Sequence, residues 1–544
     1  MFKLPIMNYI SRKRKWLLLP GFAVVASLLL GGCTKRFEKL NTNPDALYTA
    51  DLLADYHYLG DPFKQAQLNI YVAAPPDNTQ LQQNLMGDVF SGYMCAPTPF
   101  ANNINNLSYA LVDGWNTTPW DDAYKAVMAP LQYLFSFATA TKFQGFFGVA
   151  KIVQVEAMHR VSDIYGPIVY NKFGVINPDG SVSYDAQKDD YYAFFNDLDS
   201  AITALSPLAA QGLVSDTLAP FDLAYGGNYT NWVKLANTLK LRLAIRINGI
   251  DPAKAKSEGE AALANSFGLM TTNADNFNIN TGQTPHPVNV MNNSWGDCRS
   301  GAPLGCYLTG YSDPRAPKYM VPAQDAAVKG QYEGIRNGIN IDAKSRYGSY
   351  AQPVTFPNSL QLIVAAEAWF LKAEAALNGW AGAGNIQTDY QTGIQTSFAQ
   401  YGLDPGSYLA DGSSSEAQYI DPNAITPGQN DIKTGSPWLS TITIKWDPTA
   451  TQAQQLERII TQKWLAMYPE GQEAWTEFRR TGYPKLFPVV INNSGGTIST
   501  TAFIRRINFA LTDRNTNPGA IPGAVKLLGG PDNGGTRLWW DIPH

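Results

Sequence analysis

Residues that could catalyse a reaction are widely scattered along this chain. Glu156 and His159 stand at positions i and i+3, the spacing of half a carboxylate-bridged metal site, but no second such pair follows. A structural histidine is therefore favoured there. The remaining histidines form neither H-E-x-x-H nor a zinc-ligand spacing: His57, His286 and His544. G-x-S-x-G, phosphate-loop and C-x-x-C motifs are all missing, so we predict no catalytic residue, no cofactor and no metal.

Cys33 is the residue whose context points most clearly to a chemical modification. Four basic residues at 12–15 precede an apolar run over 16–30, and Leu-Gly-Gly stands directly before the cysteine. The run is shorter than the roughly 20 residues that a membrane span needs. The pattern resembles a bacterial lipobox, where the signal is cut before the cysteine and the new N-terminal residue carries lipid. We predict a signal peptide over 1–32 and lipid on Cys33, with an ordinary signal peptide or an uncleaved anchor as alternatives.

Charge and composition narrow the possible ligands. Removal of residues 1–32 takes away five of the 41 basic residues and none of the 45 acidic ones, which leaves a formal charge of −9. An acidic chain has no electrostatic reason to bind nucleic acid. Aromatic residues reach 12%, while charged residues are only 16%. Rings beside neutral amides and hydroxyls suit a polyhydroxylated ligand such as a glycan, although the same rings could simply fill a core.

The elements that must position these residues are mainly helices. Apolar residues recur at three- and four-residue spacing over 231–248 and 455–467. A third helix is expected over 360–377, followed by one that carries Tyr390 and Phe398. That pair, with several small alanines, looks like one tetratricopeptide unit.

Strand signals are few, and long irregular excursions interrupt the helices. The best strand-like runs are 182–184 and 438–446, and the excursions cover 85–120, 265–320 and 403–450. The chain has no long linker and no second apolar segment of spanning length. We therefore expect a lipidated tether over 33–47 and a single, mostly α-helical domain over 48–544.

Six blocks of sequence resemble those of the SusD/RagB-like outer-membrane lipoproteins of Bacteroidetes, in the family's order. They cover nearly the whole chain after Cys33. The blocks are FEKLNTNP (37–44), SDIYGPIVY (162–170), NWVKLANTLKLRLAIR (231–246), DPR (313–315), AEA (373–375) and TQKW with EAWTEFRRTGYP (461–464 and 473–484).

This resemblance implies binding without catalysis. Four tetratricopeptide-like helical pairs would pack on a TonB-dependent, SusC-like transporter, and a loop-rich face would capture an oligosaccharide or a peptide. The protein would be held at the outer membrane by lipid on Cys33. At the cell surface it would act as a lid over the transporter barrel. The alternatives are a peptide-binding member of the family, a secreted glycoside hydrolase, or a tetratricopeptide-type scaffold.

The blocks themselves are expected to be structural. Trp232, Trp464 and Trp475 lie among apolar residues at helical spacing, so we assign them to the core. Glu473, together with the arginines at 479 and 480, is expected to form a structural ion-pair network.

Ligand contacts are expected from two of the excursions instead. Cys298 and Cys306 are close enough in a Gly/Pro-rich loop for a disulfide, with two free thiols as the alternative. The expected contacts in that loop and in the earlier one are Trp295, Tyr307, Tyr311, Asn293, Arg299, Trp115, Tyr93 and Phe100.

Overall fold

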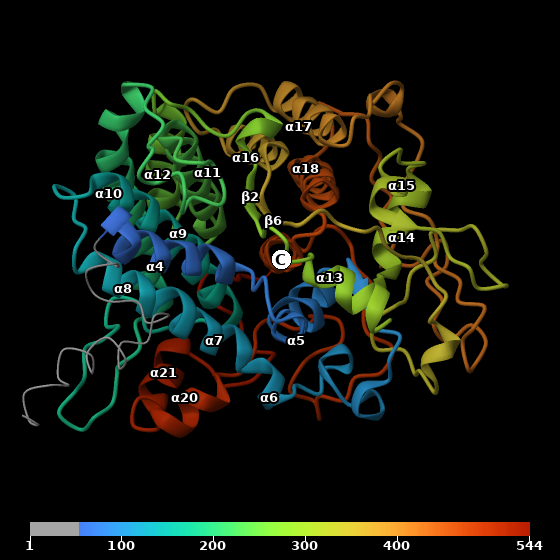
Figure 1. Ribbon diagram of the computed structural model, residues 1–544. Coiled ribbons are helices and arrows are strands. Elements are labelled where there is room, and N and C mark those ends of the chain that lie inside the picture. The colour runs from blue at the N-terminus through green and yellow to red at the C-terminus, as the bar shows by residue number, and fades with distance from the viewer. Residues whose placement is uncertain (1–53, 544) are drawn as a thin grey trace, which may run out of the picture. The chain divides into compact units, whose positions relative to one another are not determined.

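Helices make up most of the regular structure in residues 54–543, the part of the chain that the computed structural model describes (Figure 1). The predicted signal peptide, the tether and Cys33 lie outside the described residues. The contacts divide the chain after His57, and Tyr58–His544 form one unit. Among the described helices, none has both the length and the apolar character that crossing a membrane requires.

In the part of the chain that the structure describes, four helical pairs form the framework, which confirms the mostly α-helical prediction. Each helix of the first three pairs packs along its partner, α10 also packs on α11, and α18 packs on α16. The pairs are α9 (Gln144–Tyr165) with α10 (Gln187–Ala210), α11 (Tyr229–Ile247) with α12 (Pro252–Ala264), α16 (Ala365–Leu377) with α17 (Ile386–Gln400), and α18 (Gln452–Met467) with α19 (Gly471–Thr481).

The start of α11 shows how the sequence sets these helices. The side-chain oxygen of Asn228 accepts hydrogen bonds from the N–H groups of Thr230 and Asn231, at 3.0 and 3.3 Å, and so caps the helix. Trp232 is fully buried and donates from its indole N–H to Asp222 at 2.8 Å. Trp464 and Trp475 are buried as well, so all three tryptophans are core residues, as predicted.

The α16–α17 pair confirms the predicted helical hairpin with one correction at its start. A Cβ atom at Gly393 would lie 2.8 Å from the Phe370 ring, so the two helices approach as closely as they do because residue 393 has no side chain. The helix begins at Ala365 rather than at 360. The preceding residues form strand β6 (Ser359–Ile363), where Leu360 and Leu362 are both buried.

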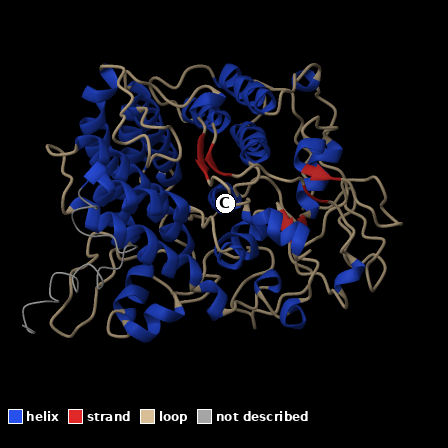
Figure 2. Ribbon diagram, in the orientation of Figure 1, coloured by secondary structure: helices blue, strands red, loops and turns tan. Residues whose placement is uncertain are grey.

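The strands form three small antiparallel sheets of two strands each (Figure 2). They pair β1 (Met94–Cys95) with β3 (Arg299–Ser300), β2 (Phe277–Asn280) with β6, and β4 (Met320–Val321) with β5 (Gln352–Pro353). The strand predictions at 182–184 and 438–446 are wrong. In the second segment, backbone carbonyls accept hydrogen bonds from tyrosine side chains and not from a neighbouring strand. The Tyr311 hydroxyl donates to the Ile442 carbonyl at 3.0 Å, and the Tyr390 hydroxyl donates to the Ile444 carbonyl at 2.6 Å.

Short helices and helical turns fill the connections. The remaining α-helices are α4 (His57–Ile70), α5 (Pro76–Thr79), α6 (Asp113–Asn116), α7 (Thr118–Asp122), α8 (Ala129–Phe135), α13 (Pro287–Asn289), α14 (Ala302–Gly310), α15 (Ala316–Tyr319), α20 (Leu511–Thr516) and α21 (Ile521–Leu528). The π-helical segments are Gln80–Asp88, Ala123–Met128 and Val290–Ser294. The 3₁₀ turns are Ala54–Tyr56, Phe100–Asn103, Asn106–Ser108, Asn273–Asp275, Lys344–Arg346 and Tyr408–Ala410.

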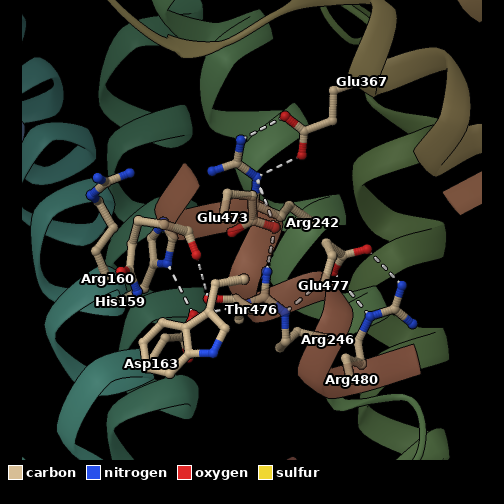
Figure 3. A network of polar contacts seen from close by, with 12 residues as sticks. His159, Arg160, Asp163, Arg242, Arg246, Glu367, Glu473, Thr476, Glu477 and Arg480 are labelled. Carbon is tan, nitrogen blue, oxygen red and sulfur yellow. Dashed lines mark hydrogen bonds and ion pairs between the residues drawn. The ribbon is translucent and has the colours of Figure 1, made fainter. Parts of the chain in front are cut away.

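A buried ionic network joins the helical pairs to one another (Figure 3). Arg246 of α11 pairs with Asp163 of α9 and with Glu473 of α19. Arg242, one turn earlier, reaches Glu367 of α16 at 2.6 Å. Each of these side chains is almost completely buried. The network therefore ties together helices that are far apart in the sequence.

The end of α19 extends the same network. Arg480 binds Glu374 of α16 at 2.6 Å and Glu477 of its own helix at 2.8 Å. Lys463 of α18 binds Glu477 at 3.1 Å. Arg479 donates to the backbone carbonyls of Asp163 and Arg505. The predicted structural ion-pair network is confirmed for Glu473 and Arg480, while Arg479 contributes hydrogen bonds to backbone carbonyls.

Candidate functional site

The two excursions predicted to carry ligand contacts lie side by side. Strand β1 of the first pairs with β3 of the second, with Met94 opposite Ser300. Beyond the strands, the Thr98 hydroxyl donates to the Asp297 carboxylate. One short sheet and one side-chain contact thus bring residues about 200 positions apart onto the same part of the molecule.

A third segment, which the sequence did not indicate, completes this region. The ammonium group of Lys344 donates to Asp297 at 2.6 Å and to the backbone carbonyl of Trp295 at 2.5 Å. The Asn103 side chain donates to the Ile341 carbonyl at 2.9 Å and to Asn340 at 3.2 Å. Residues 340–344 therefore bind both predicted loops. The loop face is defined here as Phe100, Asn103, Trp115, Asn293, Trp295 and Lys344.

The aromatic side chains of the loop face are held in place by the loops themselves. Phe100 and Trp115 pack edge to face with ring centroids 5.9 Å apart, and both are half-buried. Asn105 fixes the turn beneath them, since it donates to the Phe100 carbonyl at 2.6 Å and accepts from Leu107 N–H at 2.9 Å. Trp295 is half-buried against the core. Anchored, partly exposed rings of this kind can stack against a ligand.

The polar groups of the loop face are mostly neutral. Asn293 is exposed, and Asn103 is half-buried. The one cation of the face, Lys344, is paired with Asp297. The loop face therefore offers amide groups and aromatic rings, and its one charged side chain is paired. Such a surface suits the neutral, polyhydroxylated ligand that the composition indicated.

Three tyrosines that were predicted to contact ligand are core residues. Tyr93 and Tyr307 have no exposed surface, and Tyr311 is 2% exposed. Their hydroxyls donate to backbone carbonyls, of Trp464, Lys485 and Ile442 respectively. Burial contradicts the predicted contacts. Tyr93 directly precedes β1, Tyr307 lies in α14 and Tyr311 caps the end of that helix. The rings of Tyr93 and Tyr307 pack on Trp464, and the ring of Tyr311 packs on Tyr307.

Arg299 also points inward. It is 8% exposed, and its guanidinium donates to the Gly348 carbonyl at 2.9 Å and to the Asn292 side chain at 3.0 Å. Burial lowers the pKa of Arg299. The guanidinium positions the loops around it, so the predicted ligand contact does not match its geometry.

The predicted disulfide is not formed. Cys95, Cys298 and Cys306 are buried free thiols. The Cys298 sulfur lies 3.5 Å from the Met94 sulfur, whereas Cys306 packs with Tyr419 and Phe487 in a different cluster. Helix α14 begins at Ala302 and carries Cys306 away from the strand that precedes it. Burial raises the pKa of the Cys298 thiol to about 12, so it is protonated at neutral pH.

A second group of residues has the chemical types of a metal site but a different role. Among the described residues, one group of three possible metal ligands lies close together. It consists of His159, Asp163 and Glu473, and one donor atom of each lies within 4.8 Å of the others. Arg246 already pairs with both carboxylates (Figure 3). Burial disfavours a charged imidazole, but Glu156 and Asp163 outweigh it and raise the pKa of His159. The trio therefore belongs to the ionic network, as predicted for the Glu156–His159 pair.

Comparison with known families identifies the class of protein to which this helical framework and its loop face belong. A family model described as SusD-like, Susd and RagB outer membrane lipoprotein, matches residues 39–541. The chain therefore belongs to the SusD-like family. A search of curated proteins found no match.

Several solved structures are similar over nearly their whole length. A chitin-binding SusD homolog from Flavobacterium johnsoniae is 41% identical, with a TM-score of 0.84, over 90% of this chain and 99% of that one. A SusD homolog from Bacteroides vulgatus is 36% identical, with a TM-score of 0.82, over 90% and 98%. A SusD-like protein from Bacteroides thetaiotaomicron is 32% identical, with a TM-score of 0.82, over 89% and 99%.

Proposed function

We propose that this chain is a non-catalytic, lipid-anchored protein of the cell surface that captures a neutral glycan on its loop face. It delivers that glycan to a partner TonB-dependent, SusC-like transporter. The observation that carries the proposal is the loop face itself, where three chain segments joined by hydrogen bonds present half-buried rings, amides and a lysine that is already paired with Asp297.

The loop face suits a sugar for physical reasons. A pyranose ring has flat C–H faces that can cover Trp295 or Trp115, and removing apolar surface from water contributes ~25 cal/mol per Å². The hydroxyls of the same ring can bond to the amides of Asn103 and Asn293. Because Asp297 neutralises Lys344, a charged group on the ligand is not required.

Chito-oligosaccharides are the first glycans to examine. The similar protein from Flavobacterium johnsoniae is described as chitin-binding and is 41% identical to this chain. N-acetylglucosamine oligomers are neutral, and their acetamido groups add a donor and an acceptor to each ring. A peptide ligand is the alternative, and an array that displays both classes of ligand distinguishes the two.

The test is an array of glycans and peptides probed with the full-length protein in detergent. We expect binding to neutral oligosaccharides, chito-oligosaccharides among them, and no release of product from any glycan. The Trp295→Ala variant should bind the same glycan more weakly by ~1–3 kcal/mol, the range for a buried aromatic or aliphatic side chain. Its melting temperature should change little, because the ring is only half-buried.

Tyr307→Ala serves as the matched control. Tyr307 is on the same excursion but fully buried, so this variant should lose ~3–5 kcal/mol of stability, as large-to-small core substitutions do. Normal glycan binding by Trp295→Ala would place the ligand elsewhere. Hydrolysis of an array glycan would instead support the enzyme alternative.

Family membership supports the transporter partner and the lipid anchor, which remain parts of this proposal. Stacked helical pairs are quasi-rigid and offer extended surfaces for docking, while loops carry variable ligand contacts. The division between a helical framework and a loop face in this chain fits such a pair of tasks.

A further inference from the structure

A second concave site lies apart from the loop face. It is a groove of about 370 Å³ between the β2–β6 sheet, α13, α15 and the end of α17. Volumes above about 300 Å³ are typical of small-molecule sites. The lining of the groove includes Asn278, Phe356, Gln361, Gln400, Tyr401 and Tyr468.

One side of the groove is aromatic. Phe356 and Tyr468 have ring centroids 6.0 Å apart, and Tyr401 packs edge to face on Tyr319 at 5.2 Å. Phe356 and Tyr401 are half-buried, so each ring retains exposed surface. Rings in such fixed positions can stack on an apolar ligand face without an ordering cost of their own.

The other side of the groove presents an amide whose orientation is fixed. The NH₂ group of Gln361 donates to the backbone carbonyls of Met467 and Tyr468, at 3.1 Å each. Its side-chain oxygen therefore faces Gln400, which donates to it at 2.7 Å. Gln400 Oε1 is left as a buried acceptor that receives no hydrogen bond from the described protein. Buried polar atoms normally have a protein or water partner, and because Gln400 lines the groove, a ligand bound there can supply the donor.

The charge state of the groove is close to neutral. His286 accepts the Val288 N–H at its Nδ1 at 3.2 Å, and its ring packs on Phe356 at 4.9 Å. Burial lowers the pKa of His286 to about 3, so the imidazole is uncharged. Lys318 is then the one charged residue in the described lining, and its side chain is exposed.

Two other cavities of similar size lack this combination. A cavity of about 310 Å³ is lined by the charged groups of Arg246, Glu374 and Arg480, which already pair within the ionic network. A cavity of about 410 Å³ beside Phe173 and Ile176 has polar groups that are already bonded within the protein, since the Tyr184 hydroxyl donates to Asp513 in its lining. Its Asn517 amide donates to the Val182 carbonyl at 2.9 Å.

We infer that the groove around Tyr401 and Gln400 is a second glycan subsite, which takes one or two pyranose units of a neutral oligosaccharide. The ring of Tyr401 stacks on the sugar, and Gln400 Oε1 accepts a hydrogen bond from a sugar hydroxyl or acetamido N–H. The inference rests on the proposed function for the class of its ligand, but not on the loop face as the place of binding.

The groove and the loop face lie at opposite ends of one short helical stretch. His286 precedes α13, and Trp295 follows the adjoining turn over Val290–Ser294. The eight helical residues at 287–294 span on the order of 12 Å. The two sites are therefore separate for a disaccharide, and a longer glycan can engage either of them.

Equilibrium dialysis of radiolabelled chitobiose against the full-length protein in detergent tests the inference. At a chitobiose concentration that just saturates the wild type, we expect two molecules per chain for the wild type, close to one for Trp295→Ala, close to one for Tyr401→Ala and almost none for the double variant. Tyr401→Phe, which keeps the ring, should retain both. Gln400→Ala should weaken the groove site about tenfold, equivalent to ~1.4 kcal/mol, and keeps the test valid if Tyr401→Ala does not fold.

Each outcome decides between the two sites. Two molecules per chain at unchanged affinity in both Tyr401→Ala and Gln400→Ala would overturn the groove. The groove would also be overturned if the Trp295→Ala variant bound no chitobiose, because the groove site should remain in that variant. If Trp295→Ala behaves like the wild type while Tyr401→Ala loses sugar, the loop face of the proposed function fails and the groove stands. A wild type that binds neither chitobiose nor another neutral disaccharide contradicts both.

Discussion

Cysteines at 95, 298 and 306 have different neighbours in the core, and none has a sulfur partner within bonding distance. Cys298 lies beside Met94 and the Asn84 amide, whereas Cys306 packs on Tyr419. The rigidity of the loop face therefore comes from the contacts of Asp297, Lys344 and Asn105, and not from a covalent bridge.

Reduction should consequently leave the protein unchanged. With dithiothreitol, both the melting temperature and glycan affinity should equal those of the untreated protein. The Cys33→Ser variant, unfolded in guanidinium, should show three reactive thiols with a chromogenic thiol reagent, before and after reduction. One reactive thiol before reduction and three after it would demonstrate the disulfide between Cys298 and Cys306.

Asp88 is a buried carboxyl whose charge state should make stability depend on pH. Its neighbours are Gln83, which donates to it at 3.0 Å, and Glu470, whose carboxylate adds repulsion. Burial and Glu470 raise the pKa of Asp88 to about 8, against about 3.9 in an unfolded chain. The folded protein therefore holds a proton that the unfolded chain releases above pH 4.

It follows that this contribution to stability is complete below pH 4 and is lost as the pH rises to about 8. The loss should approach ~1.4 kcal/mol per pH unit for one group, and it should level off above pH 8. Urea unfolding at pH 6, 7, 8 and 9 should show this decline in the wild type and a flatter profile in Asp88→Asn. Asp342→Asn is the control, since the Arg346 side chain lowers the pKa of exposed Asp342 to about 2. Parallel profiles for wild type and Asp88→Asn would rule the explanation out.

At the scale of the helices, the ionic network is the main polar link between pairs. Arg246 connects α11 to both α9 and α19, and Arg480 connects α19 to α16. Replacing a buried ion pair by apolar residues is often harmless, but removal of one partner leaves an uncompensated buried charge. The network therefore makes the arrangement of the pairs sensitive to single substitutions.

Arg246→Ala should lower the free energy of unfolding by ~3–5 kcal/mol, because Asp163 and Glu473 would remain buried without their partner. Lys125→Ala removes an exposed pair with Asp121 and should change stability by less than ~1 kcal/mol. Chemical denaturation of both variants measures the two effects. Equal, small losses would mean that the buried network contributes no more than a surface pair.

For the whole molecule, the sequence predicted the framework much better than the site. Arg242, Arg246, Glu473 and Arg480 stand in the blocks that resemble the SusD/RagB family, and the structure places them in the network between the helical pairs. Helical periodicity likewise identified α11, α17 and α18. Both signals arise from burial, which repeats along a helix and constrains residue types.

The ligand contacts could not be predicted in the same way. Tyr93 and Trp295 are both aromatic residues of irregular loops, yet one is buried and the other half-exposed. Their difference depends on Trp464 and Lys344, which are far away in the sequence. Residues 340–344 carried no signal at all, because their role comes from contacts with Asn103 and Trp295.

Purification of the tagged chain from native membranes in mild detergent tests the proposed transporter partnership most directly. We expect a large TonB-dependent β-barrel to copurify with the wild type, and palmitate to label the wild type but not Cys33→Ser. Recovery of the wild-type chain without any such barrel, under conditions that preserve other outer-membrane complexes, would contradict its assignment as the binding partner of a transporter.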